Sequence, residues 1–296
     1  MHEKSMPLIL PETSSGSLAD LPGRQASANP GKVTFSVRSG SEWTDVTAAT
    51  FAADVAALAK GLMAAGIAPG EAVGIMSRTR YEWTVADFAL WSAGAVPVPI
   101  YETSSPDQVE WILADSAAVA VIVEDAAHLA AVEASRSRLP GLREVWVIGQ
   151  GDIDSLSQDG DDVDDADLAA RRSALQRDSL ATIIYTSGTT GRPKGVVHTH
   201  FSLLDRAAAC QKFDKLTNTE EVLAYMPPAW VGQNIFSYAQ WLSCGYVVNC
   251  PESNATVTID LKEVGPTYYF APPRIFEGLL TSVMIRMEDA GSFKKW

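Results

Sequence analysis

A short loop near residue 190 of this 296-residue chain combines glycines, hydroxyls and a lysine. Residues 185–195 read Tyr-Thr-Ser-Gly-Thr-Thr-Gly-Arg-Pro-Lys-Gly. Glycines let backbone N–H groups approach an anion, hydroxyls donate hydrogen bonds to phosphate oxygens, and a lysine adds a compact positive charge. This composition indicates a polyphosphate site, and ATP is the expected ligand.

The spacing within this loop differs from that of the P-loop of NTPases. Gly188 and Lys194 have the P-loop separation, but Pro193 stands where the second glycine belongs and Gly195 where the magnesium-binding hydroxyl belongs. A P-loop also opens a helix, whereas apolar residues on both sides of this loop predict two strands. We therefore expect a strand–loop–strand site in which a helix dipole is not the main source of phosphate affinity.

Two histidines follow the loop. His198 and His200 are two residues apart in the strand predicted over 195–200, so we expect them to share a face. Imidazole titrates near neutrality, which suits acid–base chemistry, and two such side chains also suggest a metal site. Because the neighbouring sequence offers no third ligand, a structural role is the favoured interpretation.

Alternating strands and helices must position this loop. Up to residue 30 the chain is expected to be a flexible leader, and a first α/β unit is expected over about 45–150. Within this unit the pattern predicts strands over 72–76, 95–100, 119–123 and 144–148, with helices between them over 81–93, from 105 and over 126–137. Such alternation predicts an α/β fold with doubly wound, mostly parallel sheets and flanking helices.

A second α/β unit is expected over 171–296, after the loop-forming region 151–168. The pattern predicts strands over 221–226, 246–249 and 268–271, and helices from near 202, over 234–243 and over 274–289. Eight aspartates lie between residues 152 and 167, without the glycine and glutamate spacing of an EF-hand. A solvated surface loop is therefore favoured for 151–168.

The net charge of the chain limits the kinds of molecule that it is expected to bind. A formal net charge of −13 would repel nucleic acid and anionic lipid surfaces outside local basic spots, so we expect no nucleic-acid partner. Three cysteines without a CxxC pair suit a reducing compartment, and a cytoplasmic location is expected. No apolar run reaches the length of a membrane span, while peripheral membrane contact stays open.

The loop resembles the signature loop of the adenylate-forming enzymes, whose members include acyl-CoA synthetases, luciferases and peptide-synthetase adenylation domains. The resemblance implies an ATP-dependent acid–thiol ligase that forms an acyl-adenylate and passes the acyl group to coenzyme A. It implies that Lys194 stabilises the departing pyrophosphate and that Thr186 also approaches Mg²⁺. The residues implied to contact the ATP phosphates are Thr186, Ser187, Gly188, Thr189, Thr190, Gly191 and Lys194.

Three further stretches extend the resemblance over most of residues 40–296. Residues 91–101 resemble an early helix-to-strand element, residues 226–232 a second substrate-side loop, and residues 270–277 a segment typical of long-chain acyl-CoA synthetases. Trp230 stands where many relatives have a histidine, and its indole either lines an acyl tunnel or fills core volume. The residues expected at the acyl pocket are Trp230, Val231, Gln233, Asn234 and Tyr238.

Other motifs of the family are missing from this chain. The Tyr-Gly-x-Thr-Glu turn, the ribose-binding aspartate and the small C-terminal domain with a second catalytic lysine do not occur before Trp296. We therefore expect a truncated or split long-chain fatty acid–CoA ligase, with a separately encoded C-terminal half as one possibility, and no full activity from these residues alone. A non-catalytic acyl- or phosphate-binding module and an enzyme for aryl or other carboxylic acids remain as alternatives.

Overall fold

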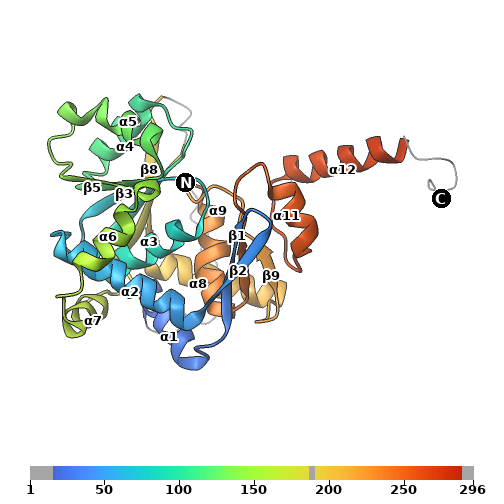
Figure 1. The fold of residues 1–296 in the computed structure, drawn as a ribbon, viewed down its shortest axis with the longest axis horizontal. Helices are drawn as coiled ribbons and strands as arrows, with labels where there is room; N and C mark the ends of the chain where they lie inside the picture. The colour runs from blue at the N-terminus through green and yellow to red at the C-terminus, as the bar shows by residue number, and fades with distance from the viewer. Residues whose placement is uncertain (1–15, 187–190, 289–296) are drawn as a thin grey trace, which may run out of the picture.

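The computed structural model describes residues 16–186 and 191–288 (Figure 1). One of its sheets contains β3 (Ala72–Met76), β4 (Val96–Ile100), β5 (Ala120–Val123) and β6 (Glu144–Val147), in the order β4-β3-β5-β6. All three strand pairs are parallel. β3, β4 and β5 are short apolar runs that are buried on both faces, as a parallel sheet between helices requires, and the edge strand β6 is buried only at its end. The predicted α/β fold with parallel sheets and flanking helices is confirmed.

Helices cover both faces of this sheet. The side chains of Met76, Val121 and Val123 pack with residues of α4 (Pro106–Asp115) and α5 (Ala126–Glu133). On the other face, Val73 and Ile75 pack with residues of α2 (Ala48–Ala64) and α3 (Tyr81–Ser92). Successive strand residues point to opposite faces, so each run supplies both layers of core (Figure 1).

The second sheet joins distant parts of the chain. It contains β1 (Val33–Ser39), β2 (Glu42–Thr47), β9 (Glu221–Leu223) and β10 (Val247–Cys250), in the order β2-β1-β10-β9. β1 pairs with β2 antiparallel and with β10 parallel. The β1–β2 hairpin was not predicted, and its pairing with β10 differs from the expected division into two consecutive units.

Two segments that were expected to be irregular are helical. In place of a flexible leader, a 3-10 turn η1 (Leu18–Asp20) and helix α1 (Leu21–Ala28) pack on the core, where Leu18 is fully buried. The acidic stretch forms α6 (Asp152–Asp159) and α7 (Asp165–Ser173) in place of the expected solvated loop. Ile153, Leu156 and Leu168 explain this second difference, because they bury one side of each helix while the aspartates stay outside.

The C-terminal elements surround β9 and β10. They are α8 (His200–Asp214), α9 (Val231–Asn234), a π-helix η4 (Ile235–Gln240), α10 (Trp241–Cys244), α11 (Val257–Val264) and α12 (Pro273–Glu288). Short 3-10 turns η2 (Arg136–Arg138) and η3 (Ile148–Gln150) lie beside β6. α12 projects from the body of the molecule (Figure 1), and none of its residues is buried.

The strand predicted over 268–271 does not form. The backbone N–H groups of Thr267 and Tyr268 both donate to the same carbonyl, that of Glu221, so no ladder develops. Pro272 and Pro273 follow and supply no N–H group for further pairing. This segment therefore runs beside β9 as irregular chain.

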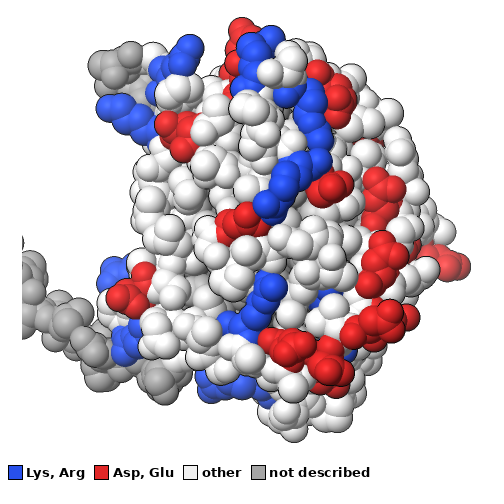
Figure 2. Space-filling model, turned by 90° about the vertical axis from the view of Figure 1, so that its left-hand side faces the viewer, with Lys and Arg blue, Asp and Glu red and all other residues white. Residues whose placement is uncertain are grey.

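The surface carries charges of both signs. Figure 2 shows a short band of Lys and Arg side chains on one face, bordered by Asp and Glu side chains. Over the described residues, no helix is both long enough and apolar enough to cross a bilayer.

Candidate functional site

The glycine- and hydroxyl-rich loop connects two antiparallel strands, β7 (Leu180–Thr186) and β8 (Lys194–Thr199). In this hairpin Thr186 lies directly opposite Lys194, so the hydroxyl and the ammonium group flank the mouth of the loop. The predicted strand–loop–strand arrangement is confirmed. Ser187, Gly188, Thr189 and Thr190, which were predicted to contact phosphate, lie outside the described residues.

Two glycines of the loop meet backbone and packing requirements. Gly191 has a φ of +128°, a conformation that residues with a Cβ rarely adopt, and a Cβ there would have no neighbour within 4 Å. At Gly195 a Cβ would lie 2.8 Å from Cγ2 of Ile183 and 3.2 Å from Cζ of Tyr185. The first position therefore favours glycine for its backbone conformation, and the second lets the tyrosine ring lie across β8.

The hairpin lies along β4, at the edge of the parallel sheet. The Thr182 hydroxyl donates to the Pro97 carbonyl at 2.9 Å, and the Trp91 indole N–H donates to the Ala181 carbonyl at 2.6 Å. Pro97 and Pro99 lack the N–H groups that a regular ladder with β7 would need. Side-chain donors therefore hold the hairpin against the sheet and direct its loop beyond the carboxyl end of β4.

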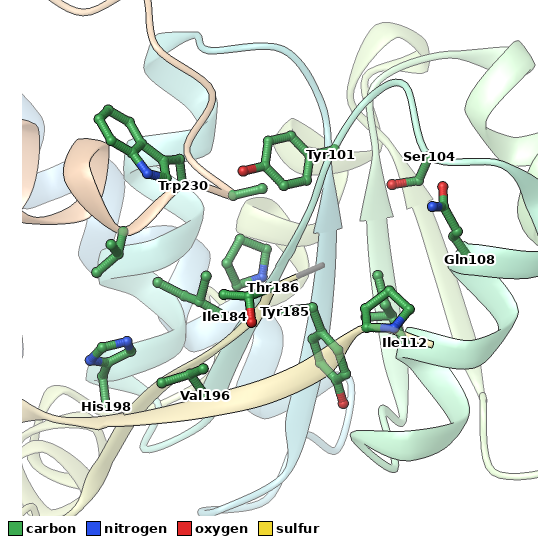
Figure 3. A pocket seen from close by; sticks show the side chains of 14 residues that line it. Tyr101, Ser104, Gln108, Ile112, Ile184, Tyr185, Thr186, Val196, His198 and Trp230 are labelled. Atoms are coloured by element: carbon green, nitrogen blue, oxygen red, sulfur yellow. The ribbon is translucent and has the colours of Figure 1, made fainter. Parts of the chain in front are cut away.

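A pocket of about 560 Å³ opens beside the mouth of the loop (Figure 3). Its volume lies in the range of small-molecule sites, and most of its wall is apolar with a few polar groups. It is lined by Pro99, Tyr101, Ser104, Gln108, Ile112, Ile184, Tyr185, Thr186, Pro193, Val196, His198, Ala229, Trp230 and Val231. The structure thus brings Thr186, Trp230 and Val231 to one pocket, and their roles there stay predictions.

Trp230 forms part of the wall opposite α4 (Figure 3). Its ring stacks on that of Phe270 with centroids 5.7 Å apart. A Cβ on Gly232 would lie 2.7 Å from the indole, so the glycine leaves room for the ring to fold back over the start of α9. The indole therefore lines the pocket rather than only filling the core.

The other three predicted pocket residues lie in the core instead. Gln233, Asn234 and Tyr238 are each 2% exposed, and none of them lines this pocket. The Asn234 amide donates to the Pro228 carbonyl at 2.7 Å, and Tyr238 packs against Phe88. Trp230 precedes α9 as its N-cap, and the residues after it turn into the core, where Tyr238 contacts Phe88 of α3.

The two histidines do not share a face, because the strand ends at Thr199 and His200 begins α8. His198 lies in the pocket wall, and partial burial lowers its pKa, so its imidazole is neutral at pH 7. His200 is fully buried, and its Nδ1 accepts a hydrogen bond from the Leu18 N–H at 3.3 Å. The structural role is confirmed for His200, whereas His198 faces the site.

Several pocket residues were missed by reasoning from the sequence. Ser104, Gln108 and Ile112 come from the start and one side of α4, at intervals of four residues. The predicted helix start at Ser105 and this spacing were the available signal, since residues four apart share a helix face. The sequence does not show that this face of α4 meets the β7–β8 hairpin, and that contact makes these residues part of the pocket.

Thr186 was predicted to lie near Mg²⁺. Among residues 16–186 and 191–288, no three His, Cys, Asp or Glu side chains come together as a metal site. Mg²⁺ at Thr186 therefore stays a prediction, in which phosphate oxygens would supply further ligands.

A parallel sheet between helices, with a glycine- and hydroxyl-rich hairpin at its edge, defines an α/β protein. The sequence profile of the AMP-binding enzyme family matches residues 23–295, and the chain belongs to this family.

Curated relatives are considerably longer than this chain. It is 39% identical over 263 residues to the long-chain-fatty-acid–CoA ligase FadD15 of Mycobacterium bovis, a match that covers 84% of this chain and 42% of that protein. It is 32% identical to the peroxisomal long chain acyl-CoA synthetase 6 of Arabidopsis thaliana, covering 81% of this chain and 36% of the relative. The chain thus spans about two fifths of the length of these relatives.

Solved structures share the fold. A long-chain-fatty-acid-CoA ligase (FadD1) from Archaeoglobus fulgidus superimposes with a TM-score of 0.80 at 21% identity, over 96% of this chain and 55% of that one. The N-terminal domain of FACL13 from Mycobacterium tuberculosis, solved with an inhibitor, matches with a TM-score of 0.69 at 25% identity, over 83% and 60% of the two chains.

Proposed function

We propose that this chain provides the ATP-phosphate loop and part of the acyl pocket of a long-chain fatty acid–CoA ligase. The observation that carries the proposal is the position of Thr186 and Lys194, opposite each other at the loop mouth and beside an apolar pocket of about 560 Å³. The names of the relatives support a fatty acid as the substrate.

In the proposed reaction a carboxylate oxygen of the fatty acid attacks the α-phosphorus of ATP, and pyrophosphate leaves. The thiol of coenzyme A then attacks the acyl carbon, and AMP leaves. Transfer of this kind depends on neutralising and positioning the phosphates more than on covalent chemistry by the protein. Mg²⁺, when bound with ATP, supplies further neutralisation of the phosphate charge.

The residues of this chain have distinct proposed roles. The backbone of the loop up to Gly191 and the Thr186 hydroxyl bind the β- and γ-phosphates, and Thr186 lies toward Mg²⁺. Lys194 neutralises the charge that develops on the departing pyrophosphate. Trp230 and Val231 form the wall along which the acyl chain lies.

Binding of MgATP tests the loop directly. We expect Lys194→Ala to weaken MgATP binding roughly 10- to 100-fold in isothermal titration calorimetry, because a charge-assisted contact to phosphate is lost. Lys212→Ala is the matched control, since it removes an exposed lysine from the last turn of α8. Equal affinities for the two variants would remove Lys194 from the site.

Palmitate-dependent ATP–pyrophosphate exchange tests the chemistry. Exchange with palmitate, and none with benzoate, would support fatty-acid adenylation by the chain itself. MgATP binding without exchange would favour the second candidate, an acyl- and phosphate-binding part of a divided enzyme. Absence of both binding and exchange would contradict the proposal.

A further inference from the structure

Helix α4 contacts both arms of the loop. On the incoming arm, the Tyr185 hydroxyl donates to Oδ2 of Asp115 at 2.7 Å. On the outgoing arm, the Trp111 indole N–H donates to the Pro193 carbonyl at 2.8 Å. Each contact is made by the residue immediately before Thr186 or Lys194, so both residues of the loop mouth have a neighbour tied to the same helix.

The two α4 residues form a single contact surface. Trp111 and Asp115 are four positions apart, so they lie on one side of the helix, one turn from each other. Trp111 also holds a second residue of the outgoing arm, because the Arg192 guanidinium lies over its ring, 4.5 Å from the centroid. We refer to Trp111 and Asp115 as the α4 brace.

The helix that carries the brace is itself firmly held. Ser105 and Gln108 form a reciprocal capping box at its N-terminus, and Pro106 occupies the first turn. On its inner side Val109, Ile112 and Leu113 are buried against the parallel sheet. The brace therefore connects the loop to a rigid part of the core, which is the arrangement that keeps a binding group in place.

The β7–β8 ladder alone does not provide this connection. It sets the separation of Thr186 and Lys194, while the Thr182 and Trp91 donors hold only the start of β7, away from the loop. The brace holds the loop end of the hairpin, because it joins both arms to the helix whose Gln108 and Ile112 line the pocket (Figure 3).

We propose that Trp111 is a positioning residue for the phosphate loop, with Asp115 as its partner on the other arm. The inference rests on the proposed function, in that the loop binds the phosphates of ATP. Trp111 acts through the Pro193 carbonyl to place Lys194, and it does not itself contact the phosphates.

The test compares two Trp→Phe variants of the 296-residue chain. Trp111→Phe keeps a smaller aromatic ring at the position beneath Arg192 and removes the N–H donor. Trp43→Phe is the matched control. The Trp43 indole also donates a hydrogen bond, to Glu263 at 3.2 Å, and also lies beside an arginine, Arg38. Trp43 is on β2 and does not line the pocket beside the loop. Tyr185→Phe removes the contact on the other arm and leaves only an exposed Asp115 without its donor.

Affinities for inorganic pyrophosphate and for MgATP are measured by titration calorimetry, with thermal unfolding of each variant alongside. We expect Trp111→Phe and Tyr185→Phe to weaken both ligands about two- to tenfold, the net effect of one hydrogen bond, and Trp43→Phe to leave both unchanged. The melting temperatures of Trp111→Phe and Trp43→Phe should be alike, which separates positioning from a general loss of stability.

The possible outcomes are distinct. Wild-type affinity in Trp111→Phe would overturn the positioning role of Trp111, and wild-type affinity in Tyr185→Phe that of Asp115, while each leaves the proposed function intact. If the unaltered chain binds neither pyrophosphate nor MgATP, the proposed function fails and the inference fails with it. Should Trp111→Phe not fold, Trp111→Leu, which also lacks the indole N–H, takes its place.

Discussion

Lowering the pH from 8 to 5 should destabilise the fold by about 2 kcal/mol through His200 alone. Its imidazole is fully buried at the start of α8, where Nδ1 accepts the Leu18 N–H. With Nδ1 as an acceptor, the ring is neutral and its proton is on Nε2, which has no hydrogen-bond partner among the described residues. Protonation of Nδ1 would break the contact with Leu18 and bury a charge.

The magnitude follows from the shift in pKa. Burial lowers the pKa of His200 from 6.5 to about 4, and nearby Asp20 opposes this only in part. Below pH 6.5 the unfolded chain takes up a proton that the folded chain does not, so stability is lost as the pH falls from about 6.5 toward 4. The full loss is about 3 kcal/mol, of which about 2 kcal/mol has occurred at pH 5.

Urea unfolding of wild type and His200→Asn at a series of pH values isolates this effect. The asparagine amide oxygen can accept the Leu18 N–H in place of Nδ1, but the side chain does not titrate. Contributions from other groups cancel in the difference between the two proteins. We expect the wild-type advantage in free energy of unfolding to shrink by about 2 kcal/mol between pH 8 and pH 5.

His198→Asn provides the matched control. It makes the same change two residues earlier, where burial also lowers the pKa but the side chain stays partly exposed. The difference in free energy of unfolding between wild type and His198→Asn should change with pH in the same direction as for His200→Asn, but by a smaller amount. A wild-type advantage over His200→Asn that stays constant across the pH range would refute the assignment of His200 as a buried neutral imidazole.

Two further predictions concern the core. Gly61→Ala should lower the free energy of unfolding, measured in urea, by about 1–3 kcal/mol, because the new Cβ would lie 1.9 Å from the Leu156 carbonyl oxygen. The control is Gly23→Ala in α1. A Cβ at Gly23 would have no atom within 4 Å, so this change should be neutral or stabilising in the same assay. Burial raises the pKa of Asp87 to about 7, so wild type loses stability as the pH rises from about 4 to 7. The free energy of unfolding of Asp87→Asn should therefore rise by about 2–3 kcal/mol relative to that of wild type between pH 5 and pH 8. Unchanged stability of Gly61→Ala, or an Asp87→Asn difference independent of pH, would contradict these predictions.

The local sequence pattern was sufficient to predict the parallel sheet and the strand–loop–strand setting of the glycine-rich loop. Short apolar runs such as Ala120–Val123 can be buried on both faces only between helices, and the segments around them have helical spacing. The strand–loop–strand setting of Lys194 followed from Pro193 and Gly195, which exclude the P-loop arrangement. These features depend on residues close together in sequence.

Features that depend on distant contacts were not predictable in this way. Gln233, Asn234 and Tyr238 were placed at the pocket because they follow Trp230, but the rotation of that segment is set by its packing against α3. Helix α7 was taken for a loop because it begins within the aspartate-rich stretch 151–168, although one buried leucine, Leu168, is enough to dock it. The role of Trp111 was invisible for the same reason, since its partner Pro193 is 82 residues away.

The pairing of β1 with β10 has a consequence for the order of folding during synthesis. Phe35 lies opposite Val248, so the sheet cannot close until more than 200 further residues have left the ribosome. At roughly 5–20 residues per second this takes on the order of 10–40 s, whereas β3 to β6 lie within residues 72–147 and can assemble well before then. During that interval the unpaired backbone edge of β1 is exposed to other chains, which makes the β1–β2 hairpin a segment where premature pairing must be avoided.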